Sequence, residues 1–347
     1  MKMKIFKKMS LIIVSMVLLI TSITGCTSST SAGGENKESK ARKWKIGHVR
    51  PKGTVVDNDV TEFVNNVKEA SDGLIEIEIY PSSQLGDYNV VQERVGMADI
   101  EMQLAPAGTN VDKSLGISSA PYLATNWDEA RELFKRDGVL INAIEEKFEK
   151  QGIKVIASYP VYFGGIALAK EPKDPANLQV SQNMKIRVPG IKSYEATAEA
   201  LGYMATPIPY AEAFTAMQTG IVDGAIGSGA EGYYSSFRDV TKCYLPLNDH
   251  FEMWYLYMSL DVWNDLSDDE KKMLEEIGLK LEEKRYETAE ADQKEFENKL
   301  KEEGIKVIEF TDEELANFAK KVRETVWPEI KDEFGAELFD SVTENIK

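Results

Sequence analysis

Residues 74–80 read LIEIEIY, so isoleucine alternates with glutamate along the segment, and Pro81 follows it. Alternation with a period of two predicts a β-strand with one buried face, which a proline ends because it cannot donate to a sheet ladder. Residues 60–67, just upstream, carry valine and phenylalanine at helical spacing. Further apolar strands are expected at 44–49, 100–104, 153–157, 185–188 and 221–226. Strands that alternate with helices indicate an α/β protein with mainly parallel sheets.

The C-terminal part predicts one unusually long helix. Ser267 and Glu270 form a capping box, and apolar residues then recur at helical spacing as far as Gly304. An unbroken helix over 268–303 would be about 54 Å long at 1.5 Å per residue, so it should bridge two lobes. Gly278 leaves two consecutive helices as the alternative. A second capping box, over 311–314, opens another helix.

Charge and composition exclude several classes of protein. The chain of 347 residues has 41 basic and 58 acidic residues, a net charge of -17, which would repel nucleic acid. The two histidines, His48 and His250, leave little room for a histidine-rich metal centre, and two cysteines cannot form a CxxC-type cluster. We therefore expect no metal site, no cofactor and no nucleic-acid partner.

The N-terminus has the pattern of an export signal. Four lysines precede the apolar run 11–20, which is too short to span a bilayer permanently. The residues before Cys26 resemble a bacterial lipobox, which implies signal residues 1–25, a lipid on Cys26 and an anchor on the outer face of the cytoplasmic membrane. An ordinary secretory signal is the alternative. Residues 26–43 are expected to form a flexible tether, and Cys243 is expected to form no disulfide.

Arg187 is the residue that most strongly suggests binding. In the strand 185–188 it shares one face with Lys185 and lies next to the carboxyl end, where open α/β sheets bind ligands. A guanidinium there can hold a carboxylate or sulfonate by two parallel bonds, although a surface salt bridge is an equal alternative on this evidence. Gln103, near the end of the strand 100–104, is a candidate hydrogen-bonding partner.

Several segments together resemble the solute-binding proteins of tripartite ATP-independent periplasmic (TRAP) transporters. They are 77–86 (IEIYPSSQLG), 96–100 (GMADI), 185–190 (KIRVPG), 200–224 (ALGYMATPIPYAEAFTAMQTGIVDG), 248–250 (NDH) and 262–267 (VWNDLS). Their order and spacing match the family over nearly the whole chain from Trp44 onward.

The resemblance implies a two-lobed, type II-like periplasmic-binding-protein fold whose lobes close over a small organic anion. Arg187 matches the arginine that pairs with the ligand carboxylate, and Tyr210 matches an aromatic position beside the ligand, with a core tyrosine as the alternative. The lobes are expected at 44–163 plus 250–290 and at 164–249 plus 291–347. The implied protein is a monomer that catalyses no reaction and delivers its ligand to the small and large subunits of a membrane permease.

Two departures from the family pattern bear on the ligand. Gly227 stands where many members have an asparagine, and Ala167 stands near the position of a second arginine. The loss of one cation disfavours a dicarboxylate and favours a monoanion. Arg50 is a candidate replacement, with an exposed loop as the alternative.

Other residues allow both functional and structural interpretations. Residues 227–232 spell GSGAEG, a weak dinucleotide fingerprint, since an exported protein has no evident supply of nicotinamide cofactor. We instead expect Gly227 and Ser228 to bring the backbone close to the ligand. Phe163 and Trp254 are candidates for lining the cleft or for the core. An exported hydrolase is the alternative function, although no G-x-S-x-G motif occurs, and presentation of the ligand to a sensor is a third.

Overall fold

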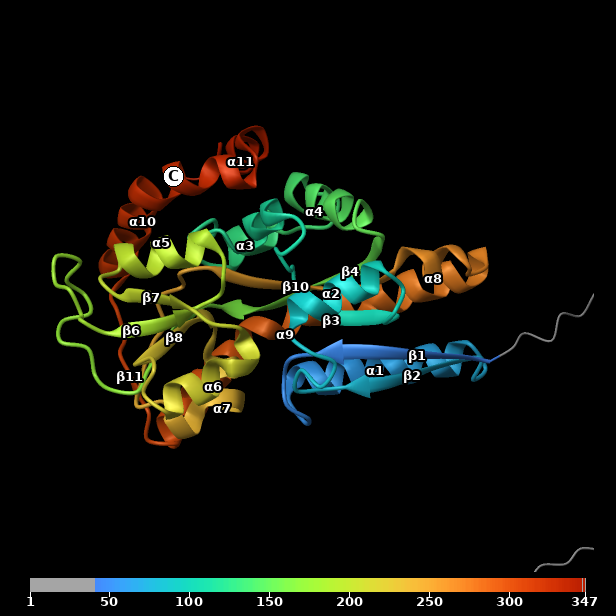
Figure 1. Ribbon diagram of the computed structural model, residues 1–347, viewed down its shortest axis with the longest axis horizontal. Coiled ribbons are helices and arrows are strands. Elements are labelled where there is room, and N and C mark those ends of the chain that lie inside the picture. Colours follow the sequence, from blue (N-terminus) through green and yellow to red (C-terminus); the bar gives the residue numbers. More distant parts are fainter. Residues whose placement is uncertain (1–40, 345, 347) are drawn as a thin grey trace, which may run out of the picture. The chain divides into compact units, whose positions relative to one another are not determined.

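The computed structural model describes residues 41–344 and 346, which contain two mixed β-sheets (Figure 1). The first sheet has the order β2-β1-β3-β10-β4. Its strands are β1 (Arg42–His48), β2 (Ile75–Tyr80), β3 (Met102–Pro106), β4 (Ile153–Phe163) and β10 (Phe251–Ser259). β1 pairs in parallel with β2 and β3, whereas β10 runs antiparallel between β3 and β4.

The second sheet has the order β11-β9-β5-β8-β6-β7. Its strands are β5 (Gly165–Leu168), β6 (Lys185–Val188), β7 (Met204–Pro207), β8 (Gly224–Ser228), β9 (Cys243–Leu245) and β11 (Lys306–Val307). β6 pairs in parallel with β7 and β8, and β5 runs antiparallel to β8 and β9. The other parallel pairs come from strand–helix–strand connections, whereas β11 pairs in parallel with β9 after the chain has passed through β10 and α9. The antiparallel pairs involve the strands that enter or leave each sheet at the crossovers.

Helices surround both sheets. They are α1 (Val55–Ala70), α2 (Tyr88–Gly96), α3 (Trp127–Leu133), α4 (Val139–Glu149), α5 (Lys192–Ala200), α6 (Tyr210–Gln218), α7 (Ala230–Phe237), α8 (Leu260–Asn264), α9 (Asp268–Glu302), α10 (Asp312–Phe334) and α11 (Ala336–Thr343), with 3-10 turns η1 (Lys113–Ser119) and η2 (Arg238–Val240). Within the described residues, no helix is both long enough and apolar enough to cross a bilayer.

The long helix is confirmed as one unbroken element. Its capping box at Ser267 and Glu270 is formed as predicted, and α9 continues for 35 residues. It packs against α1 and β4 of the first sheet's side and against α7 and β11 of the second. Gly278 does not break the helix. A Cβ at that position would lie 2.7 Å from Ile156 Cγ2, so the glycine allows close contact between α9 and β4.

The described chain passes between the sheets three times, once through α8 and α9 from β10 to β11 and twice through short crossovers. β4 passes into β5 through Gly164, and β9 passes into β10 through residues 246–250. The N–H of Gly164 donates to the carbonyl of His250 at 2.8 Å, which ties the two connections together. A Cβ on Gly164 would come within 2.1 Å of the His250 ring, so only glycine fits. The C-terminal helix α11 packs on α4, next to the first sheet.

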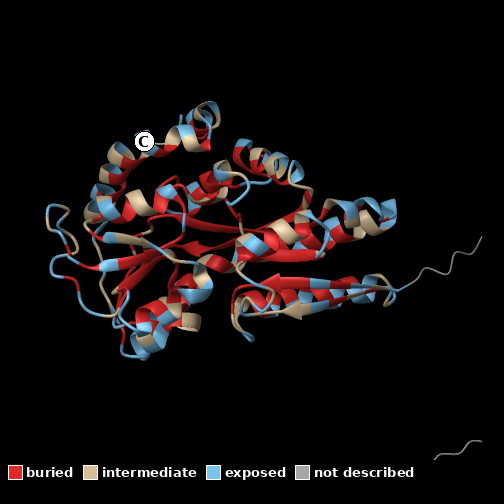
Figure 2. Cartoon of the chain, viewed as in Figure 1, coloured by how far each residue is buried: buried red, intermediate tan, exposed pale blue. Residues whose placement is uncertain are grey.

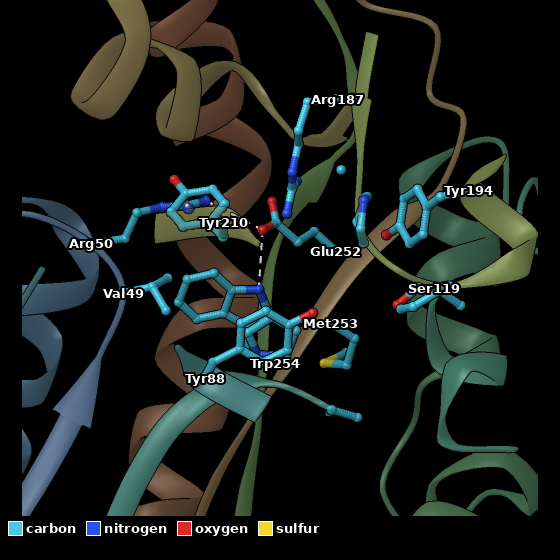
Figure 3. A pocket seen from close by; sticks show the side chains of 15 residues that line it. Val49, Arg50, Tyr88, Ser119, Arg187, Tyr194, Tyr210, Glu252, Met253 and Trp254 are labelled. Carbon is cyan, nitrogen blue, oxygen red and sulfur yellow. Dashed lines mark hydrogen bonds and ion pairs between the residues drawn. The ribbon is translucent and has the colours of Figure 1, made fainter. Parts of the chain in front are cut away.

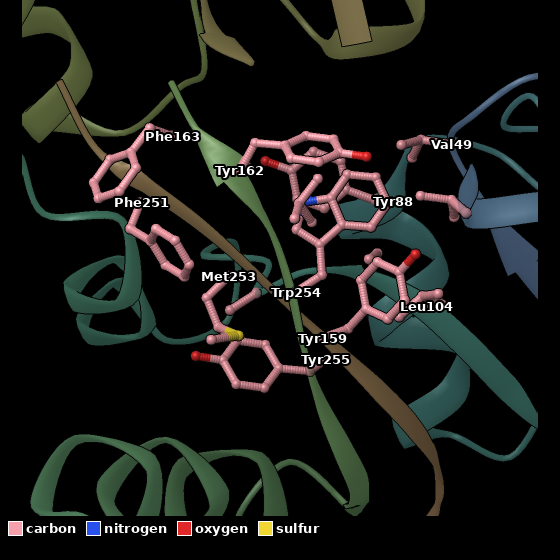
Figure 4. Close-up of a cluster of buried hydrophobic side chains, with 14 of the residues drawn as sticks. Val49, Tyr88, Leu104, Tyr159, Tyr162, Phe163, Phe251, Met253, Trp254 and Tyr255 are labelled. Atoms are coloured by element: carbon pink, nitrogen blue, oxygen red, sulfur yellow. The ribbon is translucent and has the colours of Figure 1, made fainter. Parts of the chain in front are cut away.

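The strands form the buried centre of the described chain, while the outer faces of the helices are exposed (Figure 2). Every residue of β10 is buried. Figure 4 shows the aromatic side chains that gather where β4 and β10 lie side by side, including Tyr159, Trp254 and Tyr255. Because these two strands lead to the crossovers, the core is continuous with the region where the sheets meet.

Candidate functional site

A small cavity lies where strand ends of both sheets face each other (Figure 3). Its wall comes from the loop after β1 (Arg50), the end of β3 (Pro106), β6 (Arg187), β8 (Gly227) and β10 (Glu252). The space open to the centres of water-sized atoms is about 30 Å³. A ligand of more than a few atoms therefore requires the walls to move apart.

Arg187 enters this cavity with its charge unpaired. The residue is 3% exposed, and β6 is fixed between β7 and β8. Its Nε donates to the carbonyl of Ile208 at 2.7 Å and its Nη1 to that of Ile226 at 3.3 Å. No carboxylate of the described residues forms an ion pair with it, and burial lowers the pKa of this guanidinium. The backbone thus holds Arg187 in place while Nη2 keeps its donors free.

Arg50 is a second buried cation, but its charge is already matched. Its Nε donates to Glu231 at 2.8 Å, and Nη2 approaches Glu252 at 3.3 Å. Nη1 donates to the hydroxyl of Tyr210 at 2.8 Å, and Nη2 also to Ser228 Oγ at 3.0 Å. Burial alone would lower the pKa of Arg50, yet these neighbours raise it well above its usual value. Arg50 is therefore buried and does not lie in an exposed loop. It differs from Arg187 because its charge is paired with carboxylates of the protein.

Aromatic rings form much of the remaining wall. The Cζ of Arg187 lies 5.7 Å from the ring centre of Tyr210, and the Cζ of Arg50 lies 4.8 Å from that of Trp254. Tyr88 and Tyr194 also line the cavity. Such faces provide apolar contact area and attract cationic groups. The arrangement suits a small ligand that has both a charged group and a carbon skeleton.

A family model described as "Bacterial extracellular solute-binding protein, family 7" matches residues 46–332. The chain belongs to this family. As a member it is a TRAP transport receptor that works outside the cytoplasm and is not an enzyme, so the hydrolase alternative is not supported.

Characterised relatives of the receptor are distant in sequence. A solute-binding protein of Albidiferax ferrireducens is 27% identical over 296 residues, covering 82% of this chain and 85% of the relative. The sialic acid-binding protein SiaP of Vibrio cholerae is 25% identical over 271 residues, covering 76% and 81%. The solved structure of the sugar acid binding protein DctPAm from Advenella mimigardefordensis has a TM-score of 0.81 at 20% identity, covering 88% and 97%. This last likeness confirms the two-lobed fold.

The glycines within residues 227–232 allow other segments of the receptor to approach the backbone closely. Gly227 has φ +100 and lines the cavity, and a Cβ there would lie 2.9 Å from Pro189. A Cβ on Gly229 would lie 2.4 Å from the carbonyl of Phe163, and one on Gly232 would meet Ser228 Oγ at 2.1 Å. The fingerprint is thus explained by packing around the strand end and around Arg50.

The structure brings six of the predicted residues to the cavity of the receptor and leaves two elsewhere. Five of the six line it, namely Arg187, Tyr210, Gly227, Trp254 and Arg50, and the sixth, Ser228, accepts a hydrogen bond from Arg50 at 3.0 Å. Gln103 and Phe163 do not line it. Cys26 lies outside the described residues, and Cys243 is buried and free.

The structure explains why Gln103 and Phe163 do not line the cavity. β3 ends at Pro106 rather than at 104, so Gln103 lies near its start and accepts a hydrogen bond from Tyr257 of β10 at 2.5 Å. The ring of Phe163 instead packs edge-on against Trp127 and Phe251, with ring centres 5.7 and 5.0 Å apart.

Two carboxylates at this site were not singled out from the sequence. Glu231 is fully buried on α7, and Glu252 is 7% exposed on β10. Glu252 had a visible signal, because it is the one charged residue in the apolar strand FEMWYLYMS. Glu231 had none, since its partner Arg50 lies 181 residues away in the chain. Among the described residues, no cluster of three or more side chains suits a metal ion.

Proposed function

We propose that the receptor captures a small organic anion whose carboxylate or sulfonate binds Arg187. The observation that carries this proposal is the buried guanidinium, which is fixed by two backbone carbonyls and has no carboxylate partner in the described chain. A buried charge without a counter-ion is unfavourable, and an anion that accepts two parallel hydrogen bonds removes this penalty.

Solved structures of similar fold support an acidic ligand. The Advenella protein is described in complex with galactonate, a Bordetella pertussis receptor with pyroglutamic acid and a Desulfovibrio salexigens protein with orotic acid. In this chain Arg50 is matched by Glu231, which leaves Arg187 as the cation available at the cavity wall. The ligand we propose therefore carries a single anionic group, with Tyr210 and Trp254 beside its carbon skeleton.

In this proposal the two lobes close on the ligand and the closed receptor delivers it to the membrane subunits of the permease. The proposed lobes are 44–163 plus 250–290 and 164–249 plus 291–347, which agrees with the change of sheet at Gly164 and at 246–250. Helix α11, which this division assigns to the second lobe, also contacts α4 of the first lobe. We further propose that Cys26 carries a lipid and that the receptor is a monomer. Mass spectrometry of the protein extracted from membranes tests for the lipid.

A screen of organic acids by thermal shift, followed by calorimetry, tests the function. We expect one or more monocarboxylates or sulfonates to stabilise the protein from residue 41 onward, and Arg187→Ala to abolish the shift. Arg238→Ala, which removes an arginine from an exposed site away from this cavity, is the matched control. Unchanged affinity in Arg187→Ala would show that the anchoring role is wrong.

A further inference from the structure

One oxygen of Glu252 points to a second recognition element in the cavity. Its Oε1 accepts from the indole N–H of Trp254 at 3.1 Å and lies 3.3 Å from Arg50 Nη2. Its Oε2 is buried and has no hydrogen-bond partner in the described part of the chain. An unsatisfied carboxylate oxygen in a buried site is unfavourable, so a partner from outside the protein is expected.

Two arginines and two carboxylates of the described chain surround the cavity, and Arg50 forms an ion pair with each of the carboxylates. Arg50 and Glu231 form a pair at 2.8 Å in which the other Glu231 oxygen accepts from Ser235 at 3.0 Å, so both oxygens of Glu231 are in use. Arg187 and Glu252 both line the cavity, yet they form no ion pair with each other among the described interactions. In Figure 3 their ends converge on the same space. The cavity therefore presents one cation and one acceptor to a ligand.

We propose that the ligand is a zwitterion, an amino or imino acid whose carboxylate binds Arg187 and whose N–H group donates to Glu252 Oε2. This inference rests on the proposed function and specifies its ligand class. The rings of Trp254 and Tyr88 line the same cavity and suit a nearby ammonium, because their faces attract cations. An acid with no N–H or O–H donor apart from its carboxylate would bind Arg187 alone and leave Glu252 Oε2 unsatisfied.

The surroundings of Glu252 support this assignment. Burial raises the pKa of Glu252, and Arg50 and His250 only partly oppose that effect. A ligand cation that donates to Oε2 supplies the favourable interaction that the ionised carboxylate lacks.

The test compares pairs of acids that differ only in the group facing Glu252. We would measure by calorimetry the Kd of L-alanine against L-lactate, L-proline against tetrahydrofuran-2-carboxylate, and β-alanine against 3-hydroxypropionate. We expect the nitrogen member of at least one pair to bind about tenfold or more tightly, because a cationic N–H donor takes the place of a neutral hydroxyl or an ether oxygen. Glu252→Gln should remove most of that preference.

Glu231→Gln is the matched control, since it removes the other buried carboxylate beside Arg50 without facing the cavity. It should change the Kd of both members of a pair by a similar factor and so keep the preference. If Glu252→Gln does not fold, the comparison of acids on the wild-type protein decides alone.

Three outcomes overturn the inference. Equal or tighter binding of the oxygen members, lost in Arg187→Ala, refutes the zwitterion while leaving the proposed anion receptor intact. A preference for nitrogen that survives in Glu252→Gln refutes the role of Glu252. Binding of none of these six probes, together with no hit in the wider acid screen, refutes both the inference and the proposed function.

Discussion

Gly232 on α7 offers a sharp test of how Arg50 is held. A Cβ at this position would lie 2.1 Å from Ser228 Oγ, 2.7 Å from Arg50 Nη2 and 2.9 Å from Arg50 Cζ. Both side chains are buried, and Arg50 Nη2 donates a hydrogen bond to Ser228 Oγ at 3.0 Å. No flexible surface group can move aside to make room for the added methyl group. We therefore predict that Gly232→Ala pushes the Arg50 guanidinium away from its partners.

The sign of the effect distinguishes this packing from ordinary helix behaviour. An alanine in place of a glycine inside a helix normally stabilises by about 0.5–1 kcal/mol. Overpacking costs about 1–3 kcal/mol, and separating one partner of a buried ion pair costs about 3–5 kcal/mol when the break is complete. Since Arg50 can move only part of the way, we expect a net loss of about 2–4 kcal/mol.

Urea unfolding followed by tryptophan fluorescence measures this loss, with Gly190→Ala as the control. Gly190 is exposed, and a Cβ there would meet nothing within 4 Å, so the control should change the free energy of unfolding by less than about 1 kcal/mol. Gly232→Ala should also weaken ligand binding, because Arg50 positions Tyr210 and Glu252. A Gly232→Ala protein as stable as the wild type, with the same Kd, would refute the placement of Arg50.

Three further predictions concern the anchor, a crossover and the long helix. Arg187→Lys keeps the positive charge but loses the planar guanidinium that can donate two parallel hydrogen bonds to a carboxylate. Calorimetry should therefore show a Kd about 10- to 100-fold higher for the acid that binds best, and a smaller change would argue against two parallel hydrogen bonds. Burial would lower the pKa of His250, but Asp249 at 2.6 Å raises it overall. The stability from this pair is therefore complete below about pH 6.5 and is lost as pH rises through the higher folded pKa. His250→Gln should accordingly lose more free energy of unfolding at pH 6 than at pH 9, and the reverse trend would contradict the shift. Ser267→Ala removes the capping box of α9 and should cost about 1 kcal/mol in urea unfolding, whereas no loss would show that packing alone fixes this helix end.

Local patterns predicted several elements of the fold, although the buried strand β10 was not among them. The capping box at Ser267 and the helical spacing after it depend on neighbours a few residues apart, and α9 begins and continues as they predict. The alternation in 74–80 likewise predicts β2, which spans Ile75–Tyr80. Strand ends were less certain, because the pairing partner decides where a ladder stops. β3 shifted by two residues from the predicted 100–104, and that shift alone moved Gln103 from the end of the strand to its start.

The site was predictable only where one chain segment determines it. Arg187 could be placed near the carboxyl end of its own strand, which is where β6 has it, but its role as ligand anchor rested on the family resemblance and stays a proposal. The sequence suggested Arg50 as a candidate, but it could not show whether the charge of Arg50 is available to a ligand. That depends on Glu231, which the fold brings from a helix 181 residues away in the chain. The same long-range pairing hid the role of Glu252: Trp254 is its neighbour on β10, but Arg50 comes from the loop after β1, 202 residues away in the chain.

The contrast between the two arginines explains why closure should depend on the ligand. Arg50 follows β1 of the first sheet, and its partners Ser228, Tyr210 and Glu231 belong to the second sheet or its helices, so it links the two sides with charges that the protein supplies. Arg187 is buried by the same approach of the two sides but receives no carboxylate from the described chain. Closing the empty site therefore desolvates a cation without compensation, which opposes the gain from the Arg50 contacts. An anion on Arg187 removes that opposition, and so the ligand shifts the balance toward the closed state by the difference in its affinity for the two states.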